Sequence, residues 1–274
     1  MDISQTIAAS ASVIAERSGG LIPKVGIVLG SGLGPFADDM ADAVRIPYDD
    51  LPGFPEPGVA GHAGRLSLAV VSGTPVAVMQ GRAHYYEKAE ADAMKVPVRV
   101  LQKIGCETLV LTNAAGSINP DAGPGSVMLL SDHISFTGVS PLFGEQGDHR
   151  FVDLSDAYDV EHRKHFEEAA KHVGIELYDG IYMWFCGPHF ETPAEIQAAK
   201  ILGATAVGMS TVPEVILARH AGMRVAALSI ITNLAAGMSA TKLSHEQTMA
   251  NAKIASEHVQ KLLREFLKTD QGGL

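Results

Sequence analysis

The chain has 274 residues, of which 46% are hydrophobic, and its formal net charge is -10 at pH 7. This length and apolar content suffice for one large α/β core, so we expect a single domain over residues 1–274. The acidic balance argues against a partner nucleic acid, because a surface that tracks phosphates is basic. An anionic ligand would therefore need a local cluster of cations.

Neither a signal peptide nor an apolar run of 18 residues is visible in the sequence. We therefore expect no membrane partner. The two cysteines, Cys106 and Cys186, are predicted to be buried free thiols and not a disulfide or a metal pair. A reducing cytoplasm is the simplest compartment for such a chain.

Short runs rich in Val, Ile and Leu predict the strands. They cover residues 24–29, 66–71, 76–80, 108–112, 127–131, 181–185, 205–209 and 225–232. Because these runs are almost continuously apolar, we expect a sheet that is covered on both faces. The second and third runs flank Ser72-Gly73-Thr74-Pro75 and predict a hairpin, so the sheet should be mixed.

Helical patterns alternate with these strands. The predicted helices cover residues 3–17, 89–104, 160–172, 193–202, 212–221 and 245–267. Three begin with the spacing of a capping box, at Thr192…Glu195, Thr211…Glu214 and Ser244…Gln247. Gly203 and Gly222 stand where a left-handed residue ends a helix. Residues 141–153 are predicted to be a mobile loop insertion.

Two glycine-containing segments are candidates for anion binding. Gly30-Ser31-Gly32-Leu33-Gly34 follows the first strand, and Gly34 comes one residue too early for a dinucleotide fingerprint. A loop that cradles phosphate, with Ser31 as a donor, fits better, although a purely structural turn remains open. Ser210 lies where a strand hands over to a helix N-terminus, which favours anions through free N–H groups and the helix dipole.

Cations gather at the two ends of the predicted hairpin. His62 lies before it, and Arg82 and His84 follow its second strand. Arg82 could hold an anion through a bidentate fork, and His84 could point the same way from extended chain. Each histidine taken alone is better explained as a surface or packing residue. The three together indicate an anion site.

Further polar and aromatic residues stand at the ends of other strands. Phe190 could stack on a flat ring, Glu191 could accept from ring N–H groups, and Asn233 could both donate to and accept from a heterocycle. Met209 could pad the apolar face of a sugar. Each has a plain alternative, such as a solvated Glu or a core Met. Their joint placement at strand ends predicts one pocket, since open α/β sheets bind ligands there.

Seven segments, in this order, closely resemble the trimeric purine nucleoside phosphorylases. They are Gly30-Ser31-Gly32-Leu33-Gly34, Gly61-His62-Ala63-Gly64-Arg65-Leu66, Gly81-Arg82-x-His84-x-Tyr86-Glu87, Thr112-Asn113-Ala114-Ala115-Gly116, Gly187-Pro188-x-Phe190-Glu191-Thr192, Gly208-Met209-Ser210-Thr211-Val212-Pro213-Glu214 and Thr232-Asn233. The resemblance implies the nucleoside phosphorylase fold, an α/β domain with a mixed twisted sheet, a barrel-like part and surrounding helices.

The resemblance also implies roles for individual residues. Phosphate would be held by Ser31, His62, Arg82, His84, the backbone of Ala114, and Ser210. Ribose would meet Tyr86, Met209, His245 and Phe151. The purine would meet Phe190, Glu191, Asn233, Tyr182 and Val207. The catalytic residues would be Asn233, Glu191 and His84. Phe151 would reach the site of a neighbouring subunit, which implies a homotrimer.

The implied reaction is the reversible phosphorolysis of purine nucleosides to a free base and (deoxy)ribose 1-phosphate, with inorganic phosphate as co-substrate, no cofactor and no metal. A methylthioadenosine-preferring relative is disfavoured by Asn233 and His245. A nicotinamide-dependent dehydrogenase rests on the first glycine segment alone, where the spacing fails. A non-catalytic purine-binding regulator would be expected to lose phosphate ligands that this chain keeps. The choice among inosine, guanosine and xanthosine stays open.

Overall fold

The computed structural model describes residues 2–56, 63–239 and 245–268, with the backbone alone for 245–254. Within them, nine strands form one mixed sheet in the order β2-β3-β4-β1-β5-β8-β7-β6-β9. Their bounds are β1 Val25–Val28, β2 Val44–Pro47, β3 Arg65–Val71, β4 Thr74–Gln80, β5 Thr108–Ser117, β6 Val127–Ser135, β7 Leu177–Trp184, β8 Ala206–Gly208 and β9 Arg224–Leu234.

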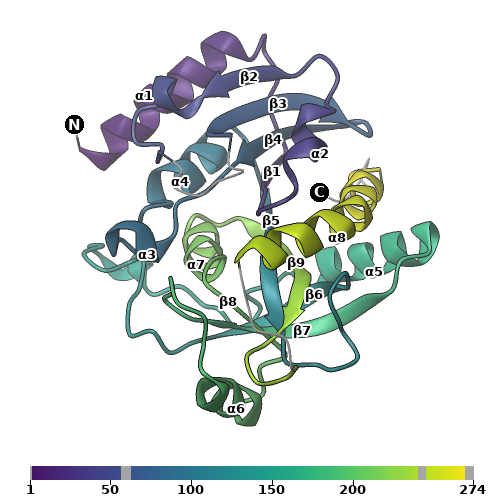
Figure 1. Cartoon of the computed structure of the whole chain (residues 1–274). Helices are drawn as coiled ribbons and strands as arrows, with labels where there is room; N and C mark the ends of the chain where they lie inside the picture. The colour runs from purple at the N-terminus through teal and green to yellow at the C-terminus, as the bar shows by residue number, and fades with distance from the viewer. Residues whose placement is uncertain (1, 57–62, 240–244, 269–274) are drawn as a thin grey trace.

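The sheet closes on itself over half of its width. Strand β9 pairs with β6 and also with β5, so β5, β8, β7, β6 and β9 form a five-stranded barrel, and β1 to β4 extend from β5 as an open sheet (Figure 1). Parallel pairs such as β1–β4 occur beside antiparallel pairs such as β3–β4. The predicted mixed α/β sheet with a barrel-like part is confirmed.

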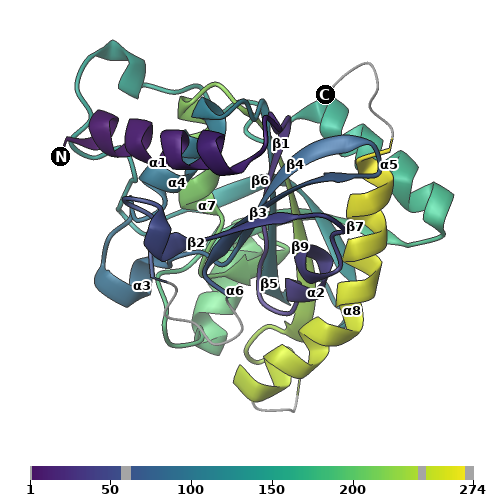
Figure 2. The ribbon, with the colours of Figure 1, turned by 90° about the horizontal axis from the view of Figure 1, so that it is seen from above.

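Helices cover both faces of the nine-stranded sheet, as Figures 1 and 2 show. One face packs against α1 (Ile3–Arg17), α4 (Lys95–Lys103) and α7 (Val212–His220). The other packs against α2 (Gly34–Asp38), α5 (Val160–Val173) and α8 (His245–Phe266). In β1, Val28 belongs to the first core and Ile27 to the second, because successive strand residues point to opposite faces. Continuous apolar strands therefore do imply a doubly covered sheet here.

Two short helices complete the fold. α6 (Pro193–Ile201) packs on the outside of the barrel through a small separate core. It begins at the predicted capping box, where Thr192 Oγ1 accepts from the N–H of Glu195 and the Glu195 carboxylate accepts from the N–H of Thr192. α3 (Tyr85–Lys88) follows the hairpin. Gly203 and Gly222 have positive φ, as predicted for helix ends.

Three short elements differ from the prediction. The helix predicted at 89–104 is wrong in its first part, because Ala89 has φ 57° and the chain resumes helix only at Lys95. β2 was missed because only Ile46 of its four residues is buried. α2 was missed because its first residues, Gly34 and Pro35, suggested a loop, although proline suits the first turn of a helix.

Strand β5 runs further than predicted. Residues 113–117 were predicted to follow the strand, yet they continue it and pair with β9, with a register shift between Ala115 and Gly116. The extra residue is Thr232 of β9. On its other side, β5 pairs with β1 of the open sheet over its first residues and with β8 of the barrel over its last two. Ala114 therefore lies inside a strand, paired with Ile230.

Cys106 and Cys186 are free thiols, as predicted, but only Cys106 is buried, and Cys186 is half-buried. No helix within the described ranges is both long and apolar enough to cross a membrane. The capping box predicted at Ser244 lies outside the described residues.

Candidate active site

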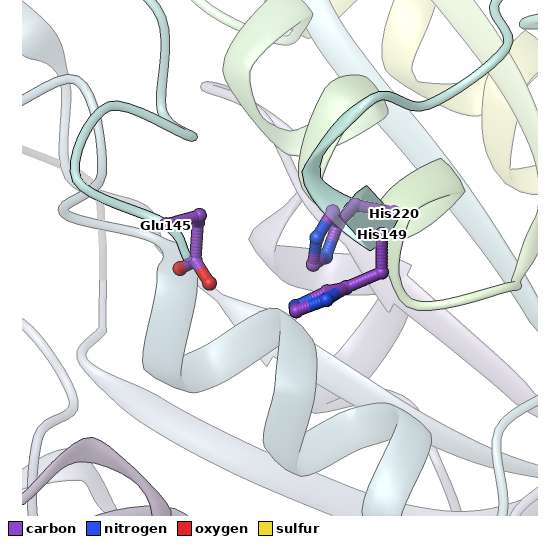
Figure 3. A group of neighbouring side chains, drawn as sticks. All are labelled: Glu145, His149 and His220. Carbon is purple, nitrogen blue, oxygen red and sulfur yellow. The ribbon is translucent and has the colours of Figure 1, made fainter. Parts of the chain in front are cut away.

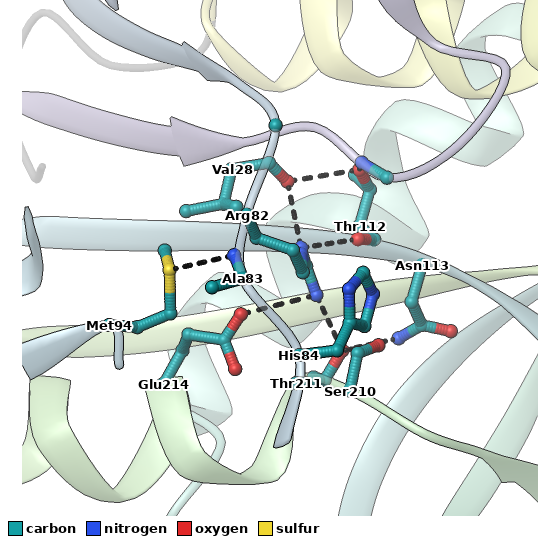
Figure 4. A network of polar contacts seen from close by, with 12 residues as sticks. Val28, Arg82, Ala83, His84, Met94, Thr112, Asn113, Ser210, Thr211 and Glu214 are labelled. Atoms are coloured by element: carbon teal, nitrogen blue, oxygen red, sulfur yellow. Dashed lines mark hydrogen bonds and ion pairs between the residues drawn. The ribbon is translucent and has the colours of Figure 1, made fainter. Parts of the chain in front are cut away.

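A buried arginine organises the centre of the candidate site. Arg82, which is 1% exposed, directs Nη2 to the carbonyls of Thr112 at 2.7 Å and Val28 at 3.4 Å. Its Nη1 donates to Thr211 Oγ1 at 3.1 Å and lies 3.4 Å from the carboxylate of Glu214 (Figure 4). The buried Nε has no hydrogen-bond partner among the residues described. Arg82 therefore offers an anion its charge and its Nε–H, while most of its fork holds the protein together.

The contacts of the Thr211 hydroxyl determine which way the hydrogen bond between Thr211 and Ser210 runs. Thr211 Oγ1 accepts from Arg82 Nη1 and from Asn113 Nδ2, at 3.1 and 2.9 Å. A hydroxyl has two lone pairs and one hydrogen, so its hydrogen is left for Ser210 Oγ, 3.1 Å away. Ser210 thus accepts from Thr211, and its own hydrogen is available to a bound anion.

Thr211 adopts an unusual backbone conformation. Its φ of 73° and ψ of -53°, with the N–H of Val212 donating to the carbonyl of Ser210 at 2.8 Å, define a γ-turn, a rare and strained conformation. The predicted capping box at Thr211…Glu214 is wrong, since Thr211 makes no side-chain cap. The side chains of Thr211 and Glu214 both contact Arg82 instead.

His84 lies against the same cluster. Its ring Nδ1 is 3.0 Å from Glu87 Oε1 and its ring stacks on that of Tyr86. Burial, helped by the Arg82 charge, lowers the pKa of His84 despite the opposing carboxylates of Glu87 and Glu214. The imidazole is therefore neutral at pH 7, and the positive charge of the site comes from Arg82.

A tyrosine inside the barrel joins the anion end to the base end. Tyr182 is buried, and its hydroxyl accepts from the N–H of Ser210 at 3.2 Å. A Cβ at Gly208 would lie 2.3 Å from this hydroxyl, so only glycine leaves room for it. Burial raises the pKa of Tyr182, and the nearby Glu191 raises it further. Tyr182 is thus a neutral hydroxyl that is hydrogen-bonded to the backbone of Ser210 and feels the charge of Glu191.

Glu191 is a buried acid with no counter-ion hydrogen-bonded to it in the described part of the chain. It is 8% exposed, and its Oε1 has no partner within the described part of the chain. Burial raises its pKa, because the charged form loses water without gaining a counter-ion. A buried carboxylate with an unused oxygen is suited to receive N–H donors from a ligand.

Asn233 lies in β9, facing the strand that carries the anion network. Its Oδ1 accepts from Thr232 Oγ1 at 2.8 Å and its Nδ2 donates to the carbonyl of Leu234 at 3.0 Å. A Cβ at Gly116 would lie 3.0 Å from Asn233 Nδ2 and 3.4 Å from Val207. Asn233 and Val207 therefore flank the same glycine of β5, as two residues predicted to meet one base should.

Met209 and Tyr86 meet beside Gly187. A Cβ there would lie 2.5 Å from the sulfur of Met209 and 2.9 Å from the ring of Tyr86. Burial and the charge of Glu87 raise the pKa of Tyr86 to about 12. The two residues predicted to contact ribose thus form one small apolar wall with a neutral hydroxyl.

The remaining predicted residues fall into two groups. Ser31, half-buried, follows Gly30, whose N–H donates to Thr112 Oγ1 at 2.8 Å, so its loop is tied to the Arg82 cluster. Phe190 is 37% exposed, and Phe151 is 75% exposed and lies under the guanidinium of Arg150. Phe151 is therefore not part of this cluster. His62 lies outside the described residues, as does the side chain of His245.

Sequence reasoning missed three residues of the anion cluster. Asn113, Thr211 and Glu214 are buried and complete the network around Arg82 and Ser210. All three stand inside the quoted motifs, so the signal was present. Thr211 and Glu214 were assigned to a cap, because their spacing matches one.

Comparisons with known proteins identify the family of the chain. Residues 24–268 match the family model described as the phosphorylase superfamily, so the chain belongs to that superfamily. It is 44% identical to purine nucleoside phosphorylase 1 of Geobacillus stearothermophilus over 90% of this chain and 88% of the relative. It is 42% identical to the purine nucleoside phosphorylase of Bos taurus, over 88% and 87%.

A solved structure supports a more specific family assignment within this superfamily. The purine nucleoside phosphorylase of Schistosoma mansoni in complex with inosine superposes with a TM-score of 0.91 at 35% identity, covering 98% of each chain. Within the superfamily, the chain is a member of the purine nucleoside phosphorylases.

Proposed function

We propose that the protein catalyses the reversible phosphorolysis of 6-oxopurine nucleosides and deoxynucleosides, such as inosine and guanosine. The products are the free purine and (deoxy)ribose 1-phosphate, and the role is purine salvage. Solved relatives from Schistosoma bind inosine, guanosine and hypoxanthine. The single observation that carries the proposal is the sharing of β5 by an anion cluster at Asn113 and a candidate base-binding group at Gly116, where Asn233 and Val207 flank the glycine.

Phosphate would bind where donors converge. Ser210 has a free hydroxyl hydrogen, Arg82 supplies buried charge and Nε–H, and Ser31 and the backbone of Ala114 flank them. His84 would lie beside the phosphate. In the neutral ring the single N–H is at Nδ1, 3.0 Å from Glu87 Oε1, so a bond from His84 to phosphate would need a proton at Nε2. Charge-assisted bonds in a buried site are short and strong, which positions the nucleophile.

The base end would act on the leaving group. As the glycosidic bond breaks, the ribosyl carbon gains positive character and the purine gains negative charge. Asn233 would donate to N7 and meet O6, and Glu191 would accept from N1–H. Bonds that strengthen at this moment lower the barrier. Phe190 would cover the ring, and Tyr182 and Val207 would line the pocket beneath it. Tyr86, Met209 and His245 would hold the ribose.

The same family resemblance supports a homotrimer that acts in the cytoplasm. Phe151 is one of the most exposed apolar side chains of the described residues and lies on a loop, as a residue reaching into a neighbouring subunit would. Light scattering on the purified protein measures the mass directly. A monomer that turns over at full rate would contradict the shared site.

The proposed function is tested by incubating the protein with inosine, with and without inorganic phosphate. Hypoxanthine and ribose 1-phosphate should form only when phosphate is present. Cleavage without phosphate would identify a hydrolase and overturn the anion-site assignments. No cleavage of inosine, guanosine or xanthosine would leave a non-catalytic purine-binding protein. Adenosine and a nicotinamide cofactor serve as negative controls.

A further inference from the structure

A second cluster of polar side chains lies at the far end of α7 from Ser210. Glu145 and His149 come from the loop 141–153, and His220 is the last residue of α7. One ligand atom from each of the three lies within 4.8 Å of the others. The two imidazole rings are 5.4 Å apart between centroids, and the carboxylate of Glu145 faces them across a gap (Figure 3).

His220 presents an unused ring nitrogen. Its Nε2 is buried and has no hydrogen-bond partner among the residues described. Burial lowers the pKa of His220, and the charge of Arg99 lowers it further. The ring is therefore neutral at pH 7, and a neutral imidazole has a lone pair for a metal. An orphaned buried nitrogen costs free energy unless a ligand satisfies it.

Glu145 is held in its charged form. Although burial favours the neutral acid, hydrogen bonds and charges from Arg99 and Lys95 lower the pKa of Glu145. Both cations contact the same oxygen, Oε1, with Arg99 Nη2 at 2.8 Å and Lys95 Nζ at 3.4 Å. The second oxygen of the carboxylate is thus the one a metal would use. The two cations also weaken the attraction of this site for a divalent ion.

We propose that Glu145, His149 and His220 bind a divalent transition metal of the zinc class. Two imidazole nitrogens and one carboxylate oxygen are a ligand set that zinc accepts, with water in the fourth position. Zinc–nitrogen bonds are about 2.0–2.1 Å, so the three ligand atoms must approach one another by on the order of 1 Å. His149, exposed on its loop, is the residue that moves.

The metal site would order the loop 141–153 and would take no direct part in phosphorolysis. The ion would clamp residues 145–149 to α7, and Phe151 follows two residues later. It would thereby order the segment proposed to reach the neighbouring active site. This consequence rests on the proposed function, whereas binding of the metal itself does not. Sequence reasoning expected no metal because His220 is remote from the other two ligands along the chain.

The test uses Co²⁺ as a spectroscopic probe and Zn²⁺ in calorimetry, on the full-length protein without an affinity tag. One Co²⁺ per chain should bind with visible d–d absorption. The variants His149→Ala, His220→Gln and Glu145→Gln should each weaken binding by at least roughly 10-fold, the scale of losing even a supporting residue. The variant His258→Ala removes an exposed histidine on α8 and should bind as the wild type does.

A fifth variant separates this site from adventitious binding. Arg99→Gln removes a cation that competes for Glu145, so it should tighten Co²⁺ binding, whereas a surface histidine site would not respond. Circular dichroism and the Tm show whether each variant is folded, and His149→Ala leaves the core untouched. No saturable binding up to about 1 mM Co²⁺, or wild-type binding by both His149→Ala and His220→Gln, would overturn the proposal. If the wild-type protein binds Co²⁺ as predicted but does not catalyse phosphorolysis, only the proposed function is contradicted.

Discussion

The two ends of the candidate site are held in opposite ways. At the anion end, Arg82 and Thr211 spend most of their hydrogen-bonding capacity on neighbouring protein groups. At the base end, Glu191 Oε1 has no partner within the described residues, and the amide of Asn233 bonds only to adjacent positions of its own strand. The anion end is therefore part of the folded core, and the base end is left for a ligand to complete. Changes at the first should cost stability and activity together, and changes at the second should separate them.

The largest effect is expected at Arg82. Arg82→Gln should lower kcat/KM by roughly 10³-fold, the upper scale for losing a stabilising group. It should also destabilise the protein by about 3–5 kcal/mol, because Glu214, 2% exposed, is left as a buried unpaired charge. Steady-state kinetics and urea unfolding measure the two losses.

A double variant tests whether these losses have one cause. Arg82→Met with Glu214→Leu removes both charges and fills the space, so stability should return close to the wild type while activity stays low. Recovery of activity in the double variant would show that Arg82 does not serve the anion.

The next effect is expected at Asn233. Asn233→Ala should lower kcat/KM by roughly 10²-fold, the scale of one lost transition-state donor, with little change in Tm. A change below about threefold would exclude the leaving-group role. Asn233→Asp should shift preference from inosine toward adenosine, because a carboxylate accepts from a 6-amino group and repels O6. Unchanged selectivity would count against the proposed base orientation.

A smaller effect is expected at Thr211. Thr211→Val keeps the shape but removes the hydroxyl that directs the Ser210 proton, so the KM for phosphate should rise by about tenfold, or about 1.4 kcal/mol, within the range of a lost hydrogen bond. Thr211→Ser keeps the hydroxyl and is the matched control. Equal phosphate KM values for the two variants would refute the proton direction inferred from the Thr211 contacts.

The smallest effect is expected in the stability of a Glu191→Gln variant. The folded-state pKa of Glu191 is raised, so the wild type is stabilised at low pH and loses that stability as pH rises through the shifted pKa. The substitution should therefore raise the Tm at pH 8 by about 2–4 °C, the shift for 1 kcal/mol, and by less at pH 5. Activity should fall at both pH values. A Tm gain at pH 5 as large as that at pH 8 would contradict a charged buried Glu191.

The long apolar elements were predictable because their signals are local. The strands at 24–29 and 225–232 and the helix at 193–202 follow from composition, capping and terminal glycine alone. The continuation of β5 to Ser117 and its register shift against β9 were not, since both depend on pairing with a strand far along the chain. Ala89 was assigned to a helix because alanine favours helices, but it ends α3 in a left-handed conformation, with its N–H donating to the carbonyl of Tyr85.

The residues of the candidate site also divide into those with a local sequence signal and those that depend on tertiary packing. Arg82, Ser210 and Asn233 were found because they follow strands and stand in recognisable motifs. The role of Thr211 was misjudged, because a capping box and a buried proton-directing hydroxyl share the same residue types and spacing. The Glu145 cluster was invisible to sequence, because His220 joins it only through the packing of α7.

The continuous strand β5 has a geometric consequence for what the protein can accept. A strand rises about 3.3 Å per residue, so Asn113 and Gly116 are separated by roughly 10 Å of strand backbone that pairs with β9. Because both residues lie in one strand, the distance between them is fixed by the strand and does not change when loops move. Under the proposed assignment, a molecule whose anion and ring are separated by much more than one sugar would not contact both ends of the site.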